Sequence, residues 1–483
     1  METPLLVTRV PESECDDDYR RVKSFNEAKL VVWTETVKLW EIAVPVALTS
    51  LFQFLGGSFT VIFVGHLGDL ELSSISLYAS VISIISMSLL MGLSTALGTL
   101  CGQAYGAGQI QSLGIYLQRS WIVLLTTCII LLPLYIYATP LLKLLGEAND
   151  IAELAGQYAI LSIPSMFSSA INLSIQRFLQ FQSKVSVIMF MSFVALLIHS
   201  GLLYLFIHVF SWGLTGAAMA GNVSSWVNAV AQLVYAISWC KEAWTGLSWF
   251  SFRDLWGFIR LCLASSVMTC FEQWYTPCII LLAGHLHNPV IAVGSYSICQ
   301  NFCGWQFMLL LGVNASVSVR VSNTLGMRHP RAAAYSLLVT MLYSILLGLV
   351  LMIIIFLSKD NLAIIFTSSK DMQLAVTDLA YLLGLTMVIN SAAQVMSGFA
   401  IGIGWQVMVA YINLACYYIV GLPLGILLGF TANLGVKGLW GGTMCGCILQ
   451  ILCLLLAIWK TNWTKEVEQI AKRMQTRSSQ NNI

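Results

Sequence analysis

Residues 92–106 read GLSTALGTLCGQAYG and residues 312–326 read GVNASVSVRVSNTLG, so a similar glycine-bounded segment recurs 220 residues later. Three shorter matches keep nearly the same offset: Gly65-His66-Leu67 with Gly284-His285-Leu286, the pair Asn172 and Gln176 with Asn390 and Gln394, and Gly213-x-x-Gly216 with Gly435-x-x-Gly438. One such match is weak evidence, but four in the same order indicate an internal duplication. The sequence therefore predicts two similar halves.

Each half is built from long apolar segments. The chain of 483 residues is 58% hydrophobic and 10% charged, against about 25% charged residues in an ordinary soluble domain. A helix that crosses a bilayer needs about 20 mostly apolar residues. The sequence offers twelve such segments, near residues 40–64, 73–97, 119–139, 153–176, 185–208, 214–239, 258–284, 291–318, 333–357, 375–401, 408–430 and 438–459. We expect an all-α polytopic membrane protein with 12 transmembrane helices in two pseudo-symmetric six-helix lobes.

The distribution of positive charge orients these spans. With both termini in the cytosol, 20 of the 24 Lys and Arg residues fall in inner segments, which is the bias typical of cytosolic loops. We expect the following division: a cytosolic tail (1–39), an N-lobe (40–239), a cytosolic linker (240–257), a C-lobe (258–459) and a second cytosolic tail (460–483). Six spans per half make both halves enter from the same side, an arrangement found in proteins whose two lobes rock about a central cavity.

Glu272 is the strongest candidate for a functional group, because it lies deep in the seventh predicted span. A charged side chain at the centre of a spanning helix costs about 2.5–3.5 kcal/mol on insertion scales, so such residues are usually functional. Desolvation disfavours the ionised form of a buried carboxyl, which suits a group that loads and releases protons. The alternative is a structural carboxyl held by Gln or Tyr neighbours.

Polar side chains follow several spans at helical spacing. In the fourth span Tyr158, Ser162, Ser165, Ser169, Asn172 and Gln176 are three or four residues apart, which places them on one face of a straight helix. Such stripes either line a wet pathway or make hydrogen bonds between helices. We expect a substrate cavity lined by Gln53, Tyr158, Asn172, Gln176, Tyr275, Gln300, Asn301, Trp305, Asn390 and Gln394.

Other functional classes have no support in the sequence. It contains no GxxxxGK[ST], GxSxG or HExxH motif, and its Cys and His residues do not have the spacing of metal ligands. We therefore expect no enzymatic activity, no use of ATP, no metal, and no cofactor other than a proton as coupling ion. A net charge of +2 gives no reason to expect nucleic acid as a partner. The expected partners are a small organic solute and the lipid bilayer, with the chain acting as a monomer.

Several motifs resemble the plant branch of the multidrug and toxic compound extrusion (MATE) family over roughly residues 35–460. They are Gly65-His66-Leu67-Gly68, Leu100-Cys101-Gly102-Gln103-Ala104-Tyr105-Gly106-Ala107, Arg177-Phe178-Leu179-Gln180, Arg320-Val321-Ser322-Asn323-x-Leu325-Gly326 and Gly402-x-Gly404-Trp405-Gln406 with Tyr411-x-Asn413. The resemblance implies a V-shaped pair of lobes and proton-coupled antiport with Glu272 as the proton carrier. It also implies export of secondary metabolites or xenobiotics, with the vacuolar membrane favoured over the plasma membrane.

This sequence also departs from the wider family. Thr60 stands where many bacterial relatives have an aspartate, Asn390 where other relatives have an acidic residue, and Gln306 where many plant members have a glutamate. Proton coupling would then depend on Glu272 nearly alone. Two other functions remain open: an anion channel, which would not need Glu272, and a lipid-type flippase, which would need more cationic residues inside the spans.

Overall fold

The computed structural model describes residues 18–19, 22–253, 255–286, 288–367 and 369–481. The expected tails fall partly outside these residues, at positions 1–17, 20–21 and 482–483. No strand occurs in the described ranges. The helices of the N-lobe are α1 (Phe25–Gly65), α2 (Asp69–Leu77), α3 (Ile84–Gly106), α4 (Ser112–Ile136), α5 (Ala138–Leu144), α6 (Asn149–Leu161), α7 (Ile163–Gln180), α8 (Val185–Leu203) and α9 (Gly213–Trp239).

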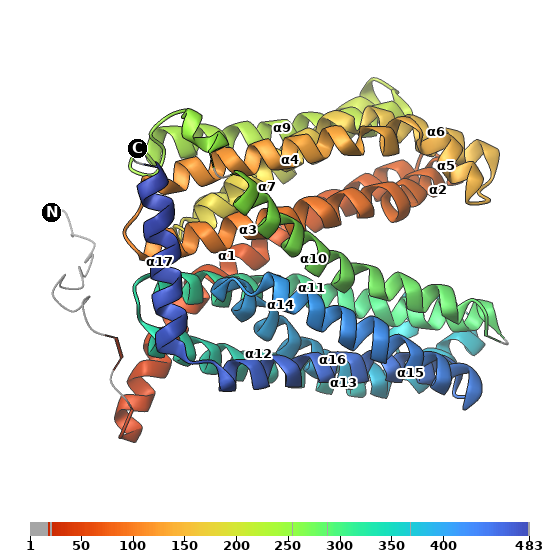
Figure 1. Ribbon diagram of the computed structural model, residues 1–483. Coiled ribbons are helices and arrows are strands. Elements are labelled where there is room, and N and C mark those ends of the chain that lie inside the picture. The colour runs from red at the N-terminus through yellow and green to blue at the C-terminus, as the bar shows by residue number, and fades with distance from the viewer. Residues whose placement is uncertain (1–17, 20–21, 254, 287, 368, 482–483) are drawn as a thin grey trace, which may run out of the picture.

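The second half follows a connection that contains a short 3-10 helix (Trp249–Phe252). The helices of the C-lobe are α10 (Leu255–Ala283), α11 (Pro289–Gly326), α12 (Pro330–Ser358), α13 (Lys370–Ile403), α14 (Gln406–Asn413), α15 (Leu422–Ile426) and α16 (Gly435–Lys460), with a 3-10 turn at Leu362–Ile365. Four π-helical segments interrupt the spans, at Tyr78–Ser83, Tyr204–Val209, Leu414–Gly421 and Leu427–Thr431. A last helix, α17 (Trp463–Asn481), runs across one end of both lobes (Figure 1).

Twelve spans were predicted, and the helices agree with that number. Within the described residues, ten helices are long and apolar enough to cross a membrane, and the bent pair α6 and α7 is an eleventh. The twelfth is α9, which does not meet the same test. It carries several polar residues, among them Asn222, Asn228 and Gln232, and these three are buried. Since α9 buries these polar side chains inside the protein, mean hydropathy alone underestimates its ability to cross a membrane.

The fourth predicted span is not one straight helix. Its two parts, α6 and α7, meet at an angle of 49° around Ser162. Pro164 is the second residue of α7, and a proline lacks the N–H that would continue the hydrogen-bond ladder of α6. The polar stripe is therefore divided, with Tyr158 on α6 and Asn172 and Gln176 on α7.

The sequence repeat appears in space as a reciprocal packing of the two lobes. A Cβ added to Gly92 of α3 would meet Ser266 of α10, and one added to the equivalent Gly312 of α11 would meet Ala43 of α1. Each half thus packs its second span against the first span of the other half. Such reciprocity is the signature of a two-fold relation, here between two lobes of one chain.

The lobes also contact each other through the repeated glycines at one end of the molecule, which we call the joined end. A Cβ on Gly106 would meet the backbone of Asn323, and one on Gly326 would meet the carbonyl of Gln103. Only glycine permits so close an approach of two helices. Away from this end the lobes diverge in a V (Figure 1).

Side-chain hydrogen bonds cross between the lobes near these glycines. Gln103 Nε2 donates to the carbonyl of Ile403 (2.9 Å), and Thr99 Oγ1 donates to the carbonyl of Ile401 (2.7 Å). Gln406 Nε2 in turn donates to Thr99 Oγ1 (2.7 Å). The chain can turn between α13 and α14 because Gly404 has a φ of 97°, a left-handed conformation that glycine adopts without strain.

An ion pair adds to the joined end. Arg320 of α11 donates from Nη2 to Glu35 Oε1 (2.6 Å) and from Nε to Glu35 Oε2 (3.0 Å). The Glu35 carboxylate, which is 0% exposed, also accepts hydrogen bonds from Tyr19 (2.9 Å) and Ser336 (2.7 Å). The N-terminal part of α1 is in this way fixed to the C-lobe.

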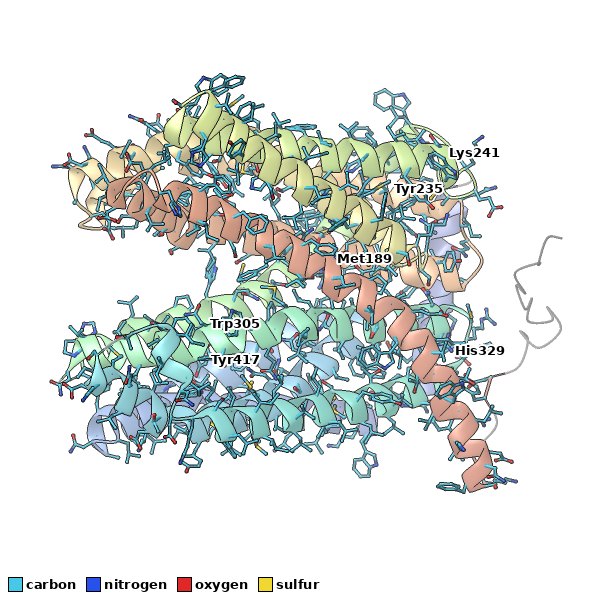
Figure 2. All side chains as sticks on the ribbon, turned by 180° about the vertical axis from the view of Figure 1, so that it is seen from behind. Met189, Tyr235, Lys241, Trp305, His329 and Tyr417 are labelled. Atoms are coloured by element: carbon cyan, nitrogen blue, oxygen red, sulfur yellow. The ribbon has the colours of Figure 1, made fainter. Side chains whose placement is uncertain are left out.

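The connection between the lobes is attached to α4. Gln118 Nε2 donates to the carbonyl of Gly246 (2.8 Å), and its Oε1 accepts from the backbone N–H of Ser248 (2.9 Å). The guanidinium of Arg119 donates to the carbonyls of Phe250, Ser251 and Arg253. Figure 2 shows Lys241 in this connection and His329 before α12 at the same end of the molecule.

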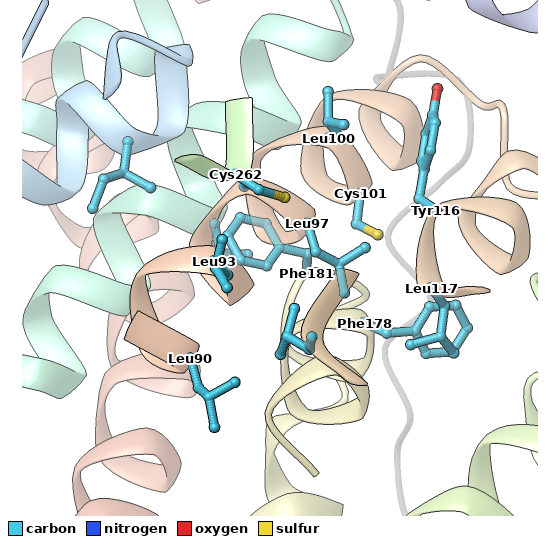
Figure 3. Close-up of a cluster of buried hydrophobic side chains, with 14 of the residues drawn as sticks. Leu90, Leu93, Leu97, Leu100, Cys101, Tyr116, Leu117, Phe178, Phe181 and Cys262 are labelled. Atoms are coloured by element: carbon cyan, nitrogen blue, oxygen red, sulfur yellow. The ribbon is translucent and has the colours of Figure 1, made fainter. Parts of the chain in front are cut away.

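One buried apolar cluster extends from the N-lobe into the joined end. Leu97 of α3, Leu117 of α4 and Phe178 of α7 have no exposed surface. Figure 3 shows Leu97 near Phe181, and Leu117 near Phe178. The Phe181 ring occupies the space that a side chain at position 98 would need, which is why Gly98 fits there. Buried residues of α17, namely Val467, Ile470 and Met474, extend the same core.

Candidate functional site

Glu272 lies near the middle of α10, inside the C-lobe, and is partly buried. Its Oε1 accepts a hydrogen bond from Asn413 Nδ2 (3.0 Å) and a longer one from Ser397 Oγ (3.3 Å). Oε2 accepts no hydrogen bond from the described residues, and none of the ion pairs found among those residues includes this carboxyl. One oxygen of Glu272 is thus held in place by two neutral donors, while the other has no hydrogen-bond partner among the described residues.

A chain of hydrogen bonds leads to Glu272 from deeper in the lobe. Tyr417 donates its hydroxyl proton to Gln450 Oε1 (2.5 Å), Gln450 Nε2 donates to Asn413 Oδ1 (2.7 Å), and Asn413 then donates to Glu272. Every donor in this series points toward the carboxyl. Hydrogen bonds arranged head to tail polarise one another in a low-dielectric interior, so the series strengthens the bond that Glu272 receives.

Helix geometry places these groups. Asn413 is the last residue of α14, and Tyr417 lies in the π-helical segment Leu414–Gly421 that follows directly. A π-helical turn displaces side chains from the α-helical face and is frequent at functional sites. Pro423 comes next, at the start of α15, where its missing N–H disturbs the ladder of the same span. The irregular backbone of this span therefore directs Asn413 and Tyr417 into the lobe.

Aromatic rings lie one helical turn from Glu272. The ring of Tyr275 is 5.1 Å from that of Tyr417 and 5.7 Å from that of Tyr418, measured between centroids. Tyr418 also donates a hydrogen bond to the backbone carbonyl of Phe271 (3.2 Å). These contacts hold α10 against the π-helical span, so they fix the side chain of Glu272 relative to its donor Asn413.

The N-lobe contains a pocket of about 350 Å³. Two of the sequence-predicted cavity residues, Gln53 of α1 and Asn172 of α7, line it, together with Thr60, His199 and several serines. Gln176 lies one turn further along α7 and contacts Asn172, its Nε2 being 3.5 Å from Asn172 Oδ1. Polar and apolar side chains both line the pocket, and none of the described lining residues carries a carboxylate.

The other predicted cavity residues lie elsewhere. Tyr158 is buried against Tyr78, with the ring centroids 5.0 Å apart, and does not line this pocket. On α11, Asn301 and Trp305 are exposed and Gln300 is partly buried; Figure 2 labels Trp305 in the C-lobe. Gln394 of α13 contacts Asn314. Asn390 accepts a weak hydrogen bond from Cys447, which also lies 3.5 Å from the Tyr417 hydroxyl. The structure thus divides the predicted set between the two lobes.

A family model described as MatE matches residues 45–205 and 264–427, which together make up more than half of the chain. The chain belongs to the MATE family. The two matched stretches begin 219 residues apart, which is the offset of the sequence repeat, so each lobe carries one copy of the MATE unit.

Curated relatives match nearly the whole chain. Protein DETOXIFICATION 34 of Arabidopsis thaliana is 56% identical over 467 residues, covering 97% of this chain and 86% of its own length. Protein DETOXIFICATION 35 of the same plant is 55% identical over 461 residues, covering 95% and 94%. The resemblance to plant MATE proteins is therefore confirmed.

Solved MATE structures share the fold. The crystal structure of the eukaryotic MATE transporter AtDTX14 superposes with a TM-score of 0.86 at 32% identity, covering 92% of this chain and 100% of that one. An outward-facing conformation of a multidrug resistance MATE family transporter superposes with a TM-score of 0.79 at 17% identity, covering 93% and 100%. The prediction of an all-α membrane protein with two lobes is thereby confirmed, and the chain is a multi-pass transport protein of this family.

Sequence reasoning missed part of this MATE site. Gln450 and Tyr417, which support Asn413, were not among the predicted residues, and His199 was given no role. A glutamine inside the apolar run from Cys447 to Leu456 was an available signal, because a polar group at that depth needs a partner. The sequence could not show that this partner is Asn413.

Proposed function

We propose that this MATE protein is a proton-coupled antiporter that exports small organic solutes from the cytosol by alternating access, with Glu272 as the proton-coupling carboxyl. The observation that carries the proposal is the setting of Glu272: a carboxyl at mid-span, held through Oε1 by two neutral donors. No cation pairs with it among the described residues. A positively charged partner would stabilise the ionised form permanently and so oppose proton uptake.

The geometry lets the carboxyl change its charge without rearranging its surroundings. When Oε2 takes up a proton, Oε1 becomes a carbonyl oxygen that still accepts hydrogen bonds from Asn413 and Ser397. When the proton leaves, the same donors stabilise the carboxylate. Proton and solute can then alternate at Glu272, so that one is released as the other binds.

One proton per solute supplies a useful driving force. A difference of one pH unit corresponds to about 1.4 kcal/mol per proton, which supports an approximately tenfold concentration ratio of solute. A membrane potential of 100 mV adds about 2.3 kcal/mol for each net charge moved. A single coupling carboxyl is therefore enough for accumulation against a gradient.

Orientation and location complete the proposal. The joined end carries α17 and the connection between the lobes, and the excess of Lys and Arg in these segments supports placing it in the cytosol. With this orientation, the side on which the lobes diverge would face away from the cytosol. We also propose the vacuolar membrane as the location, on resemblance to plant members, and one chain as the transport unit. Fluorescent fusions at native expression level test the location.

The central test is solute uptake into proteoliposomes under an imposed pH gradient. Wild type is compared with Glu272→Gln, which keeps the shape but cannot ionise, and with Glu41→Gln, which removes an exposed carboxyl from α1. We expect gradient-driven accumulation by wild type and Glu41→Gln and none by Glu272→Gln. Equal uptake by all three proteins, or an ionic current independent of the pH gradient, would contradict the proposal and favour a channel.

A further inference from the structure

The N-lobe pocket holds a titratable side chain that the proposed coupling at Glu272 does not use. His199 of α8 lines the pocket and is 8% exposed. Its Nε2 lies 2.9 Å from Thr60 Oγ1 on α1, and its Nδ1 lies 3.0 Å from Ser224 Oγ on α9. Both ring nitrogens therefore have a hydroxyl partner, supplied by two different helices.

Each of these hydroxyls has a second partner. Thr60 Oγ1 is 3.1 Å from the carbonyl of Gly56, and Ser224 Oγ is 3.1 Å from the carbonyl of Gly221. A hydroxyl has one proton to donate and lone pairs with which to accept. If both hydroxyls donate to the backbone, both ring nitrogens must donate to the hydroxyls, and the ring is then an imidazolium with every N–H satisfied.

The neutral ring fits the same heavy atoms. One hydroxyl then turns its proton from the backbone carbonyl to the bare ring nitrogen, while the other continues to accept from the remaining N–H. The two charge states differ only in the rotation of one hydroxyl group. Both states avoid an unsatisfied buried donor, which costs about 1–3 kcal/mol, so the site accepts a proton without a change in packing.

No charged group facing His199 fixes its charge state. Besides His199, the described residues that line the pocket come from α1, α3, α7, α8 and α9. None of them is titratable. Histidine has an unperturbed pKa of about 6.5, and no charge among these lining residues holds the ring in one protonation state.

The pocket is also built to receive polar groups. Ser192 is 4% exposed, and its hydroxyl has no hydrogen-bond partner among the described residues. An unsatisfied buried hydroxyl in a native structure calls for a partner such as an ion, a water or a ligand. The pocket thus combines a proton-accepting ring with a free donor in a space of about 350 Å³.

We propose that His199 is a second proton-binding group of this transporter, located in the N-lobe and separate from Glu272. Proton uptake there gives the pocket its only positive charge. The pocket then repels organic cations and favours uncharged or anionic parts of a solute. Titration of His199 does not depend on the proposed function, whereas its place in the transport cycle rests on it.

The first test reads protonation directly. The protein is labelled with ¹³C at the histidine Cε1 position and reconstituted in nanodiscs, and the signal missing from His199→Gln identifies His199. We expect this signal to titrate between about pH 5 and pH 8, and a signal that stays constant over this range would overturn the proposal. His208→Gln removes an exposed histidine from the same span and is expected to leave the His199 signal unchanged.

The second test measures how many protons are coupled to the transport of one solute. With the membrane potential clamped at zero and a gradient of one pH unit, two protons per solute give about 100-fold accumulation at equilibrium and one proton gives about tenfold. We expect the higher value for wild type and His208→Gln and the lower value for His199→Gln. Equal accumulation by all three proteins would overturn a coupling role for His199.

Two further outcomes separate a folding defect, and a failure of the proposed antiport, from the proposal for His199. Ser224→Ala keeps the histidine but removes one acceptor of the imidazolium, and it is expected to reduce the extent of the titration measured by NMR. If His199→Gln fails to fold, Ser224→Ala takes its place in the transport test. Accumulation by Ser224→Ala equal to that of wild type would then overturn the coupling role. If wild type itself shows no proton-driven uptake while the His199 signal titrates, the proposed antiport fails and the proton-binding site stands.

Discussion

The guanidinium of Arg320 in the C-lobe makes a bidentate ion pair with the fully buried carboxylate of Glu35 in α1, at 2.6 and 3.0 Å. Tyr19 and Ser336 also donate to this carboxylate. Desolvation of two charges is costly, so such a pair is stable only when its remaining hydrogen bonds are satisfied. Here they are, and the pair joins the two lobes at one end.

Removal of one partner of this pair is expected to destabilise the protein strongly. Arg320→Met leaves the Glu35 carboxylate buried without its cation, and we expect a loss of about 3 kcal/mol, the lower range for a broken buried pair. Thermal unfolding in detergent measures the effect. The matched control is Lys437→Met, which breaks the exposed pair with Asp378 and is expected to have little effect. Equal melting temperatures for the two variants would argue against a structural role for the buried pair.

Tyr19 makes the stability of this region sensitive to high pH. Burial, followed by the nearby Glu35 carboxylate, raises the pKa of Tyr19 from 10.0 to about 12. A raised pKa in the folded state means that the stabilisation is complete below pH 10 and disappears as the pH rises through 12. We therefore expect Tyr19→Phe to be less stable than wild type at pH 8, by about 1 kcal/mol, and the difference to shrink between pH 10 and 12. A difference that is constant up to pH 12 would show that the hydroxyl does not hold its proton against Glu35.

The loss of proton-driven uptake caused by removing a donor is expected to be smaller the further that donor lies from Glu272 along the hydrogen-bond chain. Asn413→Leu removes a hydrogen bond to a charged group, worth about 1.5–3 kcal/mol, so proton-driven uptake is expected to fall at least tenfold. Tyr417→Phe removes a donor two bonds further away and is expected to reduce uptake only a few fold. Initial uptake rates in proteoliposomes give the order. A larger loss from Tyr417→Phe than from Asn413→Leu would contradict the proposed chain.

The close approach of the lobes at the repeated glycines predicts a steric effect. In Gly106→Ala the new methyl group would overlap the backbone of Asn323, and overpacking of this kind costs about 1–3 kcal/mol. Gly201→Ala is the control, because no atom lies within 4 Å of a Cβ there. We expect Gly106→Ala to melt at a lower temperature than wild type and Gly201→Ala to melt at the same or a higher temperature. If both variants melt like wild type, the two helices have room to separate.

The sequence was informative where apolar length or repetition determines structure. Twelve spans, two halves and the mid-span place of Glu272 all follow from hydropathy and the offset of 218–222 residues. The extents of helices were less predictable. The first span was expected to begin at residue 40, but α1 begins at Phe25. Within this extension the buried Glu35 pairs with Arg320, a contact that hydropathy does not record.

The side-chain partners could not be predicted in the same way. Helical spacing shows that residues share a face, but it does not show which helix lies opposite. Asn413 meets Glu272 across 141 residues of sequence. The expected stripe of the fourth span was also divided, because the bend of 49° between α6 and α7 separates Tyr158 from Asn172. Such contacts depend on tertiary packing, which the pattern of one chain does not contain.

The attachment of the inter-lobe connection to α4 has a mechanical consequence. Arg119 holds the backbone carbonyl of Arg253 at 2.6 Å, and α10 begins at Leu255, so one residue separates a point fixed to the N-lobe from the first helix of the C-lobe. One residue of extended chain spans at most about 3.6 Å. The connection is therefore too short to act as a flexible tether, and the lobes have no freedom to slide apart at this point. A relative motion of the lobes that keeps the hydrogen bonds of Arg119 must therefore leave the start of α10 beside α4.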